Sequence, residues 1–319
     1  MNPIKPIFLF SLPRSGSTLL QRILSTHPSV ATTPEPWILL PLLGMRKEEI
    51  YADYDHGWAR RAIAEFRERV ADTGDEFDDE LRTFVLRLYR RAAGREASFF
   101  LDKTPRYHLI ASEILDLFPD ARALILWRNP LSIIASIIET WGMGRWNLYR
   151  YKVDLYRGLP RLIDLARQDR TNVLSVQYEE IVKNKQETLE VICDHLGVDK
   201  DGLSESIPTI DGRIGDPNQG MYDGQISKRS LKKWRKTISN IYRKKRVKKY
   251  LEWVGEERLS TMGYGYDRLI DDLRSNTTTY NHLLDDIVDS VKGSIWTIGE
   301  YKIYRDKVES NRETILHHS

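Results

Sequence analysis

The sequence has only one cysteine, Cys193, among its 319 residues. A single cysteine excludes an internal disulfide framework and a zinc site built from several thiolates. No apolar run is long enough to cross a bilayer. The first residues also lack the basic region and small-residue cleavage site of a signal peptide. From these absences we expect a cytoplasmic protein in a reducing compartment.

Charge is nearly balanced over the chain, at a formal net value of +3, but it is unevenly distributed. Residues 228–249 contain many lysines and arginines and no acidic residue. A block of this kind fits a nucleic-acid patch, a solvated helix face, or a wall beside an anionic ligand. Its composition alone leaves these three interpretations open.

The stretch PIFLFSLPRSGSTLLQRIL, residues 6–24, combines three local signals. Residues 7–10 form a continuous apolar run, which is typical of a strand buried on both faces. A turn containing proline and glycine follows, and apolar residues then recur at helical spacing. A strand, a tight turn and a helix together direct backbone N–H groups and the positive end of a helix dipole at an anion. The donors expected at this anion turn are Arg14, Ser15, Gly16, Ser17 and Thr18.

The turn differs from the P-loop of nucleoside triphosphatases. That motif, GxxxxGK[ST], places a lysine immediately before the hydroxyl residue. Here the cation, Arg14, precedes Gly16, and no lysine precedes Ser17 or Thr18. The pattern therefore favours a phosphate or sulfate ester held without a metal ion.

Three further apolar runs predict strands at residues 98–101, 121–127 and 172–177. Helical patterns alternate with them, at residues 107–118, 131–141, 146–167 and 186–196. This alternation predicts an α/β fold with a P-loop-like parallel sheet flanked by helices. Lys103, Arg128 and Tyr178 each follow a predicted strand, at the edge where open parallel sheets bind ligands.

We expect a main domain over residues 1–267, with a helical insertion at about 39–95, and a helical C-terminal extension over residues 268–319. Helices are predicted in the insertion at residues 58–70 and 80–92. The extension has apolar residues at helical spacing. It could pack on the main domain or join two copies in a homodimer.

Three segments together resemble the sulfotransferases that use 3′-phosphoadenosine 5′-phosphosulfate (PAPS). PRSGSTLLQRIL resembles the family's 5′-phosphosulfate loop, and ALILWRNPLSIIAS resembles its 3′-phosphate motif. In that motif an arginine and a serine eight positions later hold the 3′-phosphate, which implies this role for Arg128 and Ser136. VQYEEIV resembles a segment whose tyrosine approaches the nucleotide, here Tyr178.

The spacing is most similar to the tyrosylprotein sulfotransferases and their bacterial relatives. That resemblance implies Glu35 as catalytic base and Lys103, in LDKTP, as support for the reacting sulfate. QISKRSLKKWR resembles a late loop over the nucleotide, with Ser227, Lys228 and Ser230 as candidates and Ser230 preferred. Thr140 departs from the pattern, because those enzymes have an arginine there, so their acceptor does not carry over.

The resemblance implies transfer of a sulfuryl group from PAPS to a hydroxyl or amine of a small-molecule, glycan or lipid acceptor, with no metal ion. Arg14 would take up charge on the leaving phosphate. His108 is the alternative base, since another sulfotransferase branch uses a histidine after a Lys-Thr pair. Two rival interpretations are an atypical P-loop kinase and a nucleic-acid-binding protein that uses residues 228–249.

Overall fold

The computed structural model describes residues 4–44, 62–64, 66, 76–94, 96–204, 228–296 and 298. The chain divides into two compact units. The first contains residues 1–129, 154–228 and 261–263, and the second contains residues 130–153, 229–260 and 264–319.

The first unit is built on a five-stranded parallel sheet in the order β2-β3-β1-β4-β5. Its strands are β1 (Lys5–Ser11), β2 (Val30–Thr32), β3 (Phe99–Asp102), β4 (Arg122–Trp127) and β5 (Val173–Gln177). β1 and β4 are the central apolar strands, and their inner residues are buried because helices cover both faces. The order reverses at β1, with β3 on one side and β4 on the other. A ligand crevice is expected at the carboxyl ends of the strands near such a reversal.

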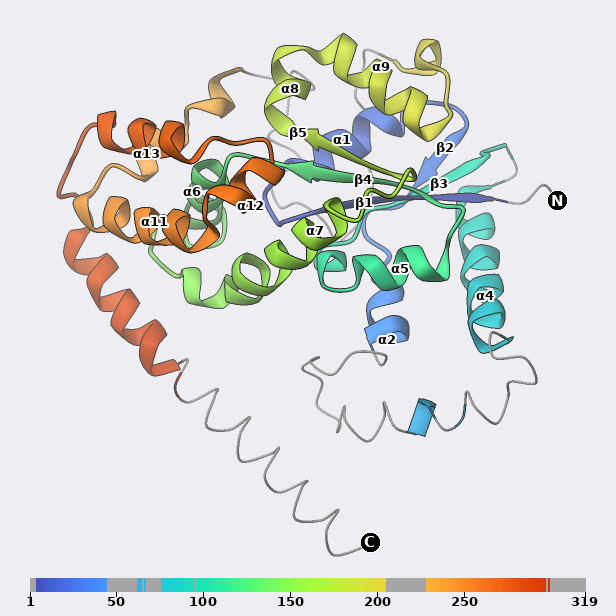
Figure 1. The fold of residues 1–319 in the computed structure, drawn as a ribbon, viewed down its shortest axis with the longest axis horizontal. Coiled ribbons are helices and arrows are strands. Elements are labelled where there is room, and N and C mark those ends of the chain that lie inside the picture. Colours follow the sequence, from blue (N-terminus) through green and yellow to red (C-terminus); the bar gives the residue numbers. More distant parts are fainter. Residues whose placement is uncertain are drawn as a thin grey trace, which may run out of the picture. The chain divides into compact units, whose positions relative to one another are not determined.

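Helices lie on both faces of this sheet (Figure 1). α1 (Ser17–Leu24), α8 (Tyr178–Lys183) and α9 (Lys185–Leu196) cover one face, and α5 (Ala111–Leu117) and α7 (Leu159–Ala166) cover the other. α4 (Glu76–Ala93) contacts the edge strand β2 and its neighbour β3. This unit also contains α2 (Leu39–Gly44), the 3₁₀ turns Tyr107–Leu109 and Lys200–Gly202, and nearly all of the π-helical turn Val153–Gly158. The predicted α/β fold with a flanked parallel sheet is confirmed.

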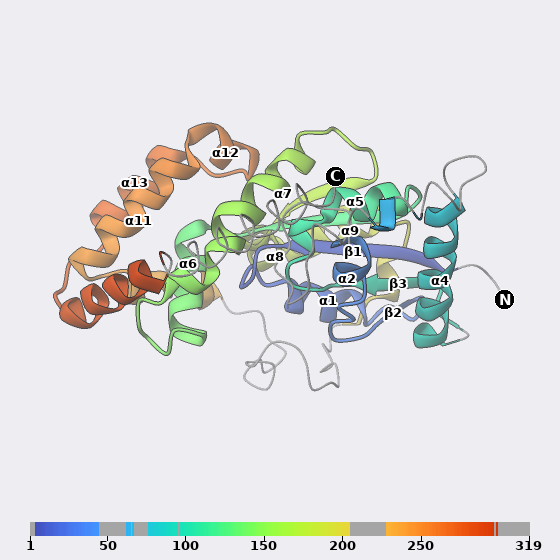
Figure 2. The same cartoon turned by 90° about the horizontal axis from the view of Figure 1, so that it is seen from below.

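The second unit is helical. It contains α6 (Pro130–Thr140), α10 (Trp234–Thr237), α11 (Ile241–Val254), α13 (Tyr266–Ser275), most of α12 (Glu256–Thr261) and a helix over residues 283–296. Shorter turns occupy Leu148–Tyr151 and Lys228–Leu231. α11 and α13 run alongside each other, as Figure 2 shows.

Several sequence-based boundaries differ from the structure. The predicted helix at 146–167 is broken into a 3₁₀ turn, a π-helical turn at Val153–Gly158, and α7. Pro160 cannot donate a backbone hydrogen bond, and it is the second residue of α7, directly after the π-helical turn. The predicted helix at 107–118 is also interrupted, at Ile110.

Two other differences concern the N-terminal half. The edge strand β2 was missed, because three residues are too short to show a period. The predicted helix at 58–70 lies largely outside the described residues. Among the helices that the structure does describe, none has the length and apolar composition needed to cross a membrane.

Candidate active site

The residues predicted at the strand ends gather at one edge of the sheet. Arg14 follows β1, Lys103 follows β3, Arg128 follows β4, and Tyr178 follows β5 as the first residue of α8. All five strands are parallel, so their carboxyl ends lie at the same edge. The topology thereby brings together residues separated by more than 160 positions in the chain.

Arg128, Arg14, Tyr178 and Gly16 form one packed cluster. The Nη1 of Arg128 donates a hydrogen bond of 2.7 Å to the backbone carbonyl of Arg14. The Arg128 guanidinium also lies 4.5 Å from the centre of the Tyr178 ring, within cation–π range. The same ring packs against Gly16 so closely that an added Cβ there would clash with Cδ2 of Tyr178. The guanidinium at the end of β4 therefore lies directly against the anion turn that follows β1.

The backbone of this turn is unusual in two places. Arg14 has φ of 67° and Gly16 has φ of 92°, both in the left-handed region. Residues other than glycine, asparagine and aspartate rarely adopt the left-handed conformation. Residues that are held in it often lie at binding sites. Gly16 directly precedes α1, so the turn ends where the N–H groups of the first helical turn begin.

Ten buried side-chain polar atoms in the described residues have no hydrogen-bond partner, and two of them lie in the anion turn and in the cluster packed against it. These two are Oγ of Ser15 and Nε of Arg128. Leaving a buried donor unpaired costs about 1–3 kcal/mol, so such atoms call for an explanation. A phosphate ester bound at the turn would supply oxygens to both. The residues present therefore fit an anionic ligand.

We expect Gly16→Ala to lower the free energy of unfolding by roughly 2–4 kcal/mol, because the new methyl group meets the Tyr178 ring and the positive φ is strained. Gly94→Ala is the matched control. Gly94 also has positive φ, of 74°, but nothing lies within 4 Å of its would-be Cβ. That control should cost only about 1 kcal/mol. Urea denaturation measures both, and equal losses would show that Tyr178 does not press on the turn.

Glu35 and Lys103 form the second feature of the site. Nζ of Lys103 lies 2.7 Å from Oε1 of Glu35, with 5% and 8% of the two side chains exposed. The pair joins the loop after β2 to the end of β3, positions 68 residues apart in the chain. A carboxylate and an ammonium group in contact at the ligand edge can serve as a proton acceptor and as a cation for a developing negative charge.

A chain of hydrogen bonds fixes Glu35 from its other side. Nε1 of Trp37 donates to Oε2 of Glu35 at 3.2 Å, and the Trp37 backbone N–H donates to the Thr104 hydroxyl at 3.3 Å. The Thr104 hydroxyl in turn donates to Oδ1 of Asp102 at 2.9 Å. Trp37 adopts φ of 59°, so the loop is held in a strained conformation beside the carboxylate.

Asp102 anchors this chain and was missed by the sequence analysis. It is fully buried, and its Oδ2 accepts hydrogen bonds from the hydroxyls of Tyr89 at 2.6 Å and Tyr107 at 3.0 Å. Burial raises the pKa of Asp102 to about 6, although these hydrogen bonds oppose the shift. Burial also raises the pKa of Tyr89 well above its usual value. The only available sequence signal was a carboxylate at the end of an otherwise apolar strand, next to Lys103.

His108 is less suited to act as the base. Its side chain is fully buried, and Nδ1 lies 3.3 Å from the Ser11 carbonyl. Nε2 lies 3.2 Å from Oδ1 of Asp154, although the two groups are not aligned for a hydrogen bond. Gly158 packs on the ring so closely that a Cβ there would clash with it. These contacts describe a core histidine.

Ser136 and Ser230 belong to the second unit, in α6 and in the turn Lys228–Leu231. Their assignments to the nucleotide stay predictions. Ser227 lies outside the described residues. Ser17 and Thr18 open α1, where the sequence placed them.

Comparison with known proteins assigns the chain to a family. The model of the sulfotransferase family matches residues 6–202, which is more than half of the chain. The chain belongs to the sulfotransferase family. The resemblance seen in the sequence is thereby confirmed, and with it the prediction of a sulfotransferase enzyme. The matched range includes Arg14, Glu35, Lys103, Arg128 and Tyr178.

Among curated proteins, the chain is 29% identical over 226 residues to the nodulation protein NoeE of Sinorhizobium fredii, covering 61% of this chain and 51% of that protein. It is 24% identical over 259 residues to protein-tyrosine sulfotransferase 2 of Gallus gallus, covering 78% and 63%. The chain thus spans between half and two thirds of the length of these relatives.

Solved structures agree on the fold. The sulfotransferase domain of the Synechococcus PCC 7002 olefin synthase matches with a TM-score of 0.50 and 26% identity, over 74% of this chain and 89% of that one. The sulfotransferase domain of the curacin biosynthetic pathway matches with a TM-score of 0.52 and 24% identity, over 82% and 98%.

Proposed function

We propose that this sulfotransferase moves a sulfuryl group from PAPS to a hydroxyl or amine of a small-molecule, glycan or lipid acceptor. The observation that carries the proposal is the buried contact between Glu35 and Lys103 at the carboxyl edge of the sheet, where the anion turn and Arg128 also lie. Family membership supports the reaction class.

In this reaction Glu35 accepts the acceptor's proton as the acceptor oxygen or nitrogen bonds to sulfur. The bond between sulfur and the bridging phosphate oxygen breaks, and that oxygen keeps the electron pair. Lys103 offsets the charge at the bridging oxygen, while Arg14 and the N–H groups at the start of α1 hold the departing phosphate. Catalysis therefore depends mainly on positioning and on fixed positive charge.

Arg128 gives the proposed nucleotide site its specificity. A guanidinium matches the oxygens of a phosphate, and this one is held against the anion turn. We assign it to the 3′-phosphate, which distinguishes PAPS from ATP. Tyr178, stacked on the same guanidinium, would flank the nucleotide, and Ser136 and Ser230 complete the predicted contacts.

The acceptor is proposed only as a class. The curated relatives include protein-tyrosine sulfotransferases, but the resemblance seen in the sequence implies that Thr140 stands where those enzymes have an arginine. We therefore favour a small-molecule, glycan or lipid acceptor over a protein tyrosine. The cytoplasmic location and a homodimer through the C-terminal helices also stay predictions.

Titration calorimetry separates this proposal from its rivals. We expect 3′-phosphoadenosine 5′-phosphate to bind at least about 100-fold more tightly than ATP with Mg²⁺, equally with and without EDTA. Tighter binding of ATP with Mg²⁺ would indicate a kinase. Salt-sensitive binding of duplex DNA without nucleotide binding would indicate a nucleic-acid-binding protein. This last outcome is disfavoured because Arg235, Arg243 and Lys244 of the basic segment are engaged in contacts within the second unit.

A further inference from the structure

The helix over residues 283–296, here called the C-terminal helix, is amphipathic, but its polar side faces the protein. Asp286 and Asp289 are buried, and so is Gly293, one helical turn further along. Six apolar residues instead lie exposed, with 40% to 77% of their surface accessible: Leu284, Ile287, Val288, Val291, Ile295 and Trp296. A helix that folds onto a hydrophobic core shows the opposite arrangement.

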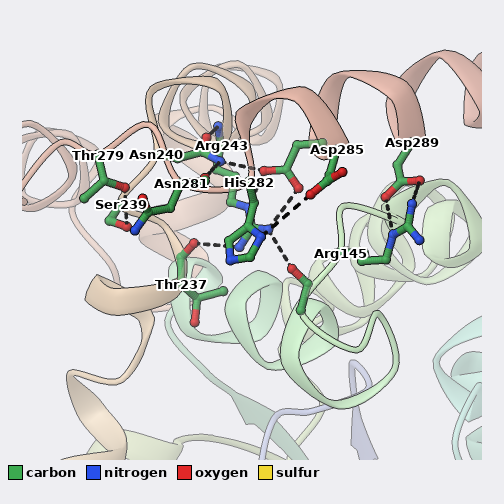
Figure 3. Close-up of polar contacts among 12 residues, drawn as sticks. Arg145, Thr237, Ser239, Asn240, Arg243, Thr279, Asn281, His282, Asp285 and Asp289 are labelled. Carbon is green, nitrogen blue, oxygen red and sulfur yellow. Dashed lines mark hydrogen bonds and ion pairs between the residues drawn. The ribbon is translucent and has the colours of Figure 1, made fainter.

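Ion pairs fix the polar side in place (Figure 3). The Arg243 guanidinium donates to both carboxylate oxygens of Asp286, at 2.7 and 2.9 Å, and Asn240 adds a third hydrogen bond at 2.6 Å. Arg243 also donates to the carbonyls of Thr237 and Gly144. Every part of this buried pair is therefore hydrogen-bonded, and removal of one partner would leave an uncompensated charge.

A second pair repeats the arrangement one turn further along. Arg145 binds Asp289 with two parallel hydrogen bonds of 2.8 and 2.7 Å. Asp289 raises the pKa of Arg145, so the guanidinium stays charged. Gly293 then lets the helix approach Tyr149, because a Cβ there would lie 2.6 Å from the ring. These contacts set the rotation of the helix and direct its apolar side outward.

The outward side has the spacing of a coiled-coil seam. Leu284, Val288, Val291 and Ile295 follow one another at intervals of four, three and four residues, and we call these four residues the seam. This is the alternating a and d spacing that buries apolar side chains between two helices. We propose that the seam binds the same seam of a second copy of this chain, in an antiparallel pair.

Charge complementarity selects the antiparallel orientation. Asp285 and Lys292 both flank the seam on the same side, at the position after Leu284 and after Val291, and both are exposed. In an antiparallel pair that sets Val288 opposite Val291, Asp285 of each copy lies opposite Lys292 of the other. The two-fold axis makes this contact twice. In a parallel pair, Lys292 would instead face the apolar Ile287.

The same charges select the register. A shift of one heptad in either direction would set Asp285 opposite Asp285, or Lys292 opposite Lys292, and like charges repel. In the selected register Leu284 also meets Ile295, so all four seam residues are covered. The exposed acidic residue beside the seam, Asp285, does not suit an anionic membrane surface, which attracts lysine and arginine.

The size of the seam indicates a reversible dimer. A buried aliphatic side chain removes roughly 60–120 Å² from water, so the seam and Ile287 offer roughly 300 Å² of exposed apolar area per copy. Together with flanking polar groups, this falls below the roughly 1,200–2,000 Å² in total that stable interfaces bury, in the range of weak and transient ones. We expect a dissociation constant on the order of 10 µM.

Sedimentation equilibrium of the full chain from about 1 to 200 µM tests the surface. The wild-type chain should dimerise with concentration, and Val291→Asp should raise the dissociation constant at least about 30-fold. Val191→Asp is the matched control, because Val191 is an equally exposed valine on α9. A wild-type monomer throughout the range, or an unchanged dimer in Val291→Asp, would overturn the proposal. So would a monomer that floats with anionic lipid vesicles.

Charge reversal tests the orientation. Asp285→Lys alone and Lys292→Asp alone should each weaken the dimer about tenfold, since each creates two like-charge contacts. The double variant should restore wild-type affinity, because it exchanges the two charges across the axis. Failure of the double variant to recover would contradict the antiparallel register.

Cysteine cross-linking gives a second measure of orientation. Leu284→Cys combined with Ile295→Cys should form intermolecular disulfides under mild oxidation, while Leu284→Cys alone should not. The two positions of one helix are about 16 Å apart, too far for a bridge within a chain. Cross-linking of the single variant would show a parallel pair. The native Cys193 is buried, and burial raises its pKa to about 11, so it does not compete.

Discussion

Replacing Glu35 by alanine is expected to lower the rate of sulfuryl transfer by about 10²–10⁴-fold and to leave binding of 3′-phosphoadenosine 5′-phosphate nearly unchanged. The reason is that the carboxylate takes a proton from the acceptor and does not touch the nucleotide in the proposed reaction. A transfer assay with ³⁵S-labelled PAPS and calorimetry with the product nucleotide measure the two quantities separately.

Removal of Glu35 also leaves the buried Lys103 without its partner, which could unfold the protein locally. Glu35→Gln addresses this, because the amide oxygen still accepts from Lys103 but cannot take a proton. Glu190→Ala is the matched control, since Glu190 pairs with Lys200 at the same 2.7 Å but on the exposed surface. Near-normal turnover in Glu35→Gln would move the base elsewhere, with His108 as the next variant.

Replacing Arg128 by alanine is expected to weaken binding of 3′-phosphoadenosine 5′-phosphate by roughly 10–150-fold, the loss of one or two charge-assisted hydrogen bonds. Binding of AMP, which has no 3′-phosphate, should change about threefold or less. Calorimetry with both ligands gives the ratio of the two losses in affinity. The prediction follows from the position of the guanidinium against the Arg14 carbonyl and the Tyr178 ring.

Two further variants control for the structural contacts of Arg128. Arg128→Lys keeps the positive charge but loses the planar group, so it should bind with intermediate affinity. Arg122→Ala removes an exposed arginine from the opposite end of the same strand and should have no effect. An equal loss for both nucleotides in Arg128→Ala would contradict the assignment to the 3′-phosphate.

The sequence predicted the strand ends well because their signals are local. Three of the five strands contain continuous apolar runs, and β5 has an apolar segment interrupted only by Ser175; each of the four is followed by a turn or a polar residue that marks its end. Once the runs are taken as parallel strands, their carboxyl ends must share one edge. Arg14, Lys103 and Arg128 could therefore be placed at that edge without any knowledge of side-chain contacts.

The contacts of Asp102 could not be predicted in this way. Tyr89 and Tyr107 reach it from two helical segments, and nothing in their sequence spacing indicates a shared partner. The short strand β2 was missed for a similar reason, since it is defined only by its pairing with β3. The apolar spacing of the C-terminal helix was visible in the sequence. The direction in which its apolar side points depends on Arg243 and Arg145, which are distant in the chain.

The contact between Glu35 and Lys103 has a consequence for timing in the proposed reaction. The Lys103 ammonium group donates to one carboxylate oxygen of Glu35, and the Trp37 indole donates to the other. While both hydrogen bonds are in place, neither oxygen is available to accept a proton from the acceptor. A sulfuryl donor that draws Lys103 toward itself would release the carboxylate at that moment. With an acceptor alone, Glu35 would then not remove the acceptor's proton. Proton removal would begin only after the sulfuryl donor has bound.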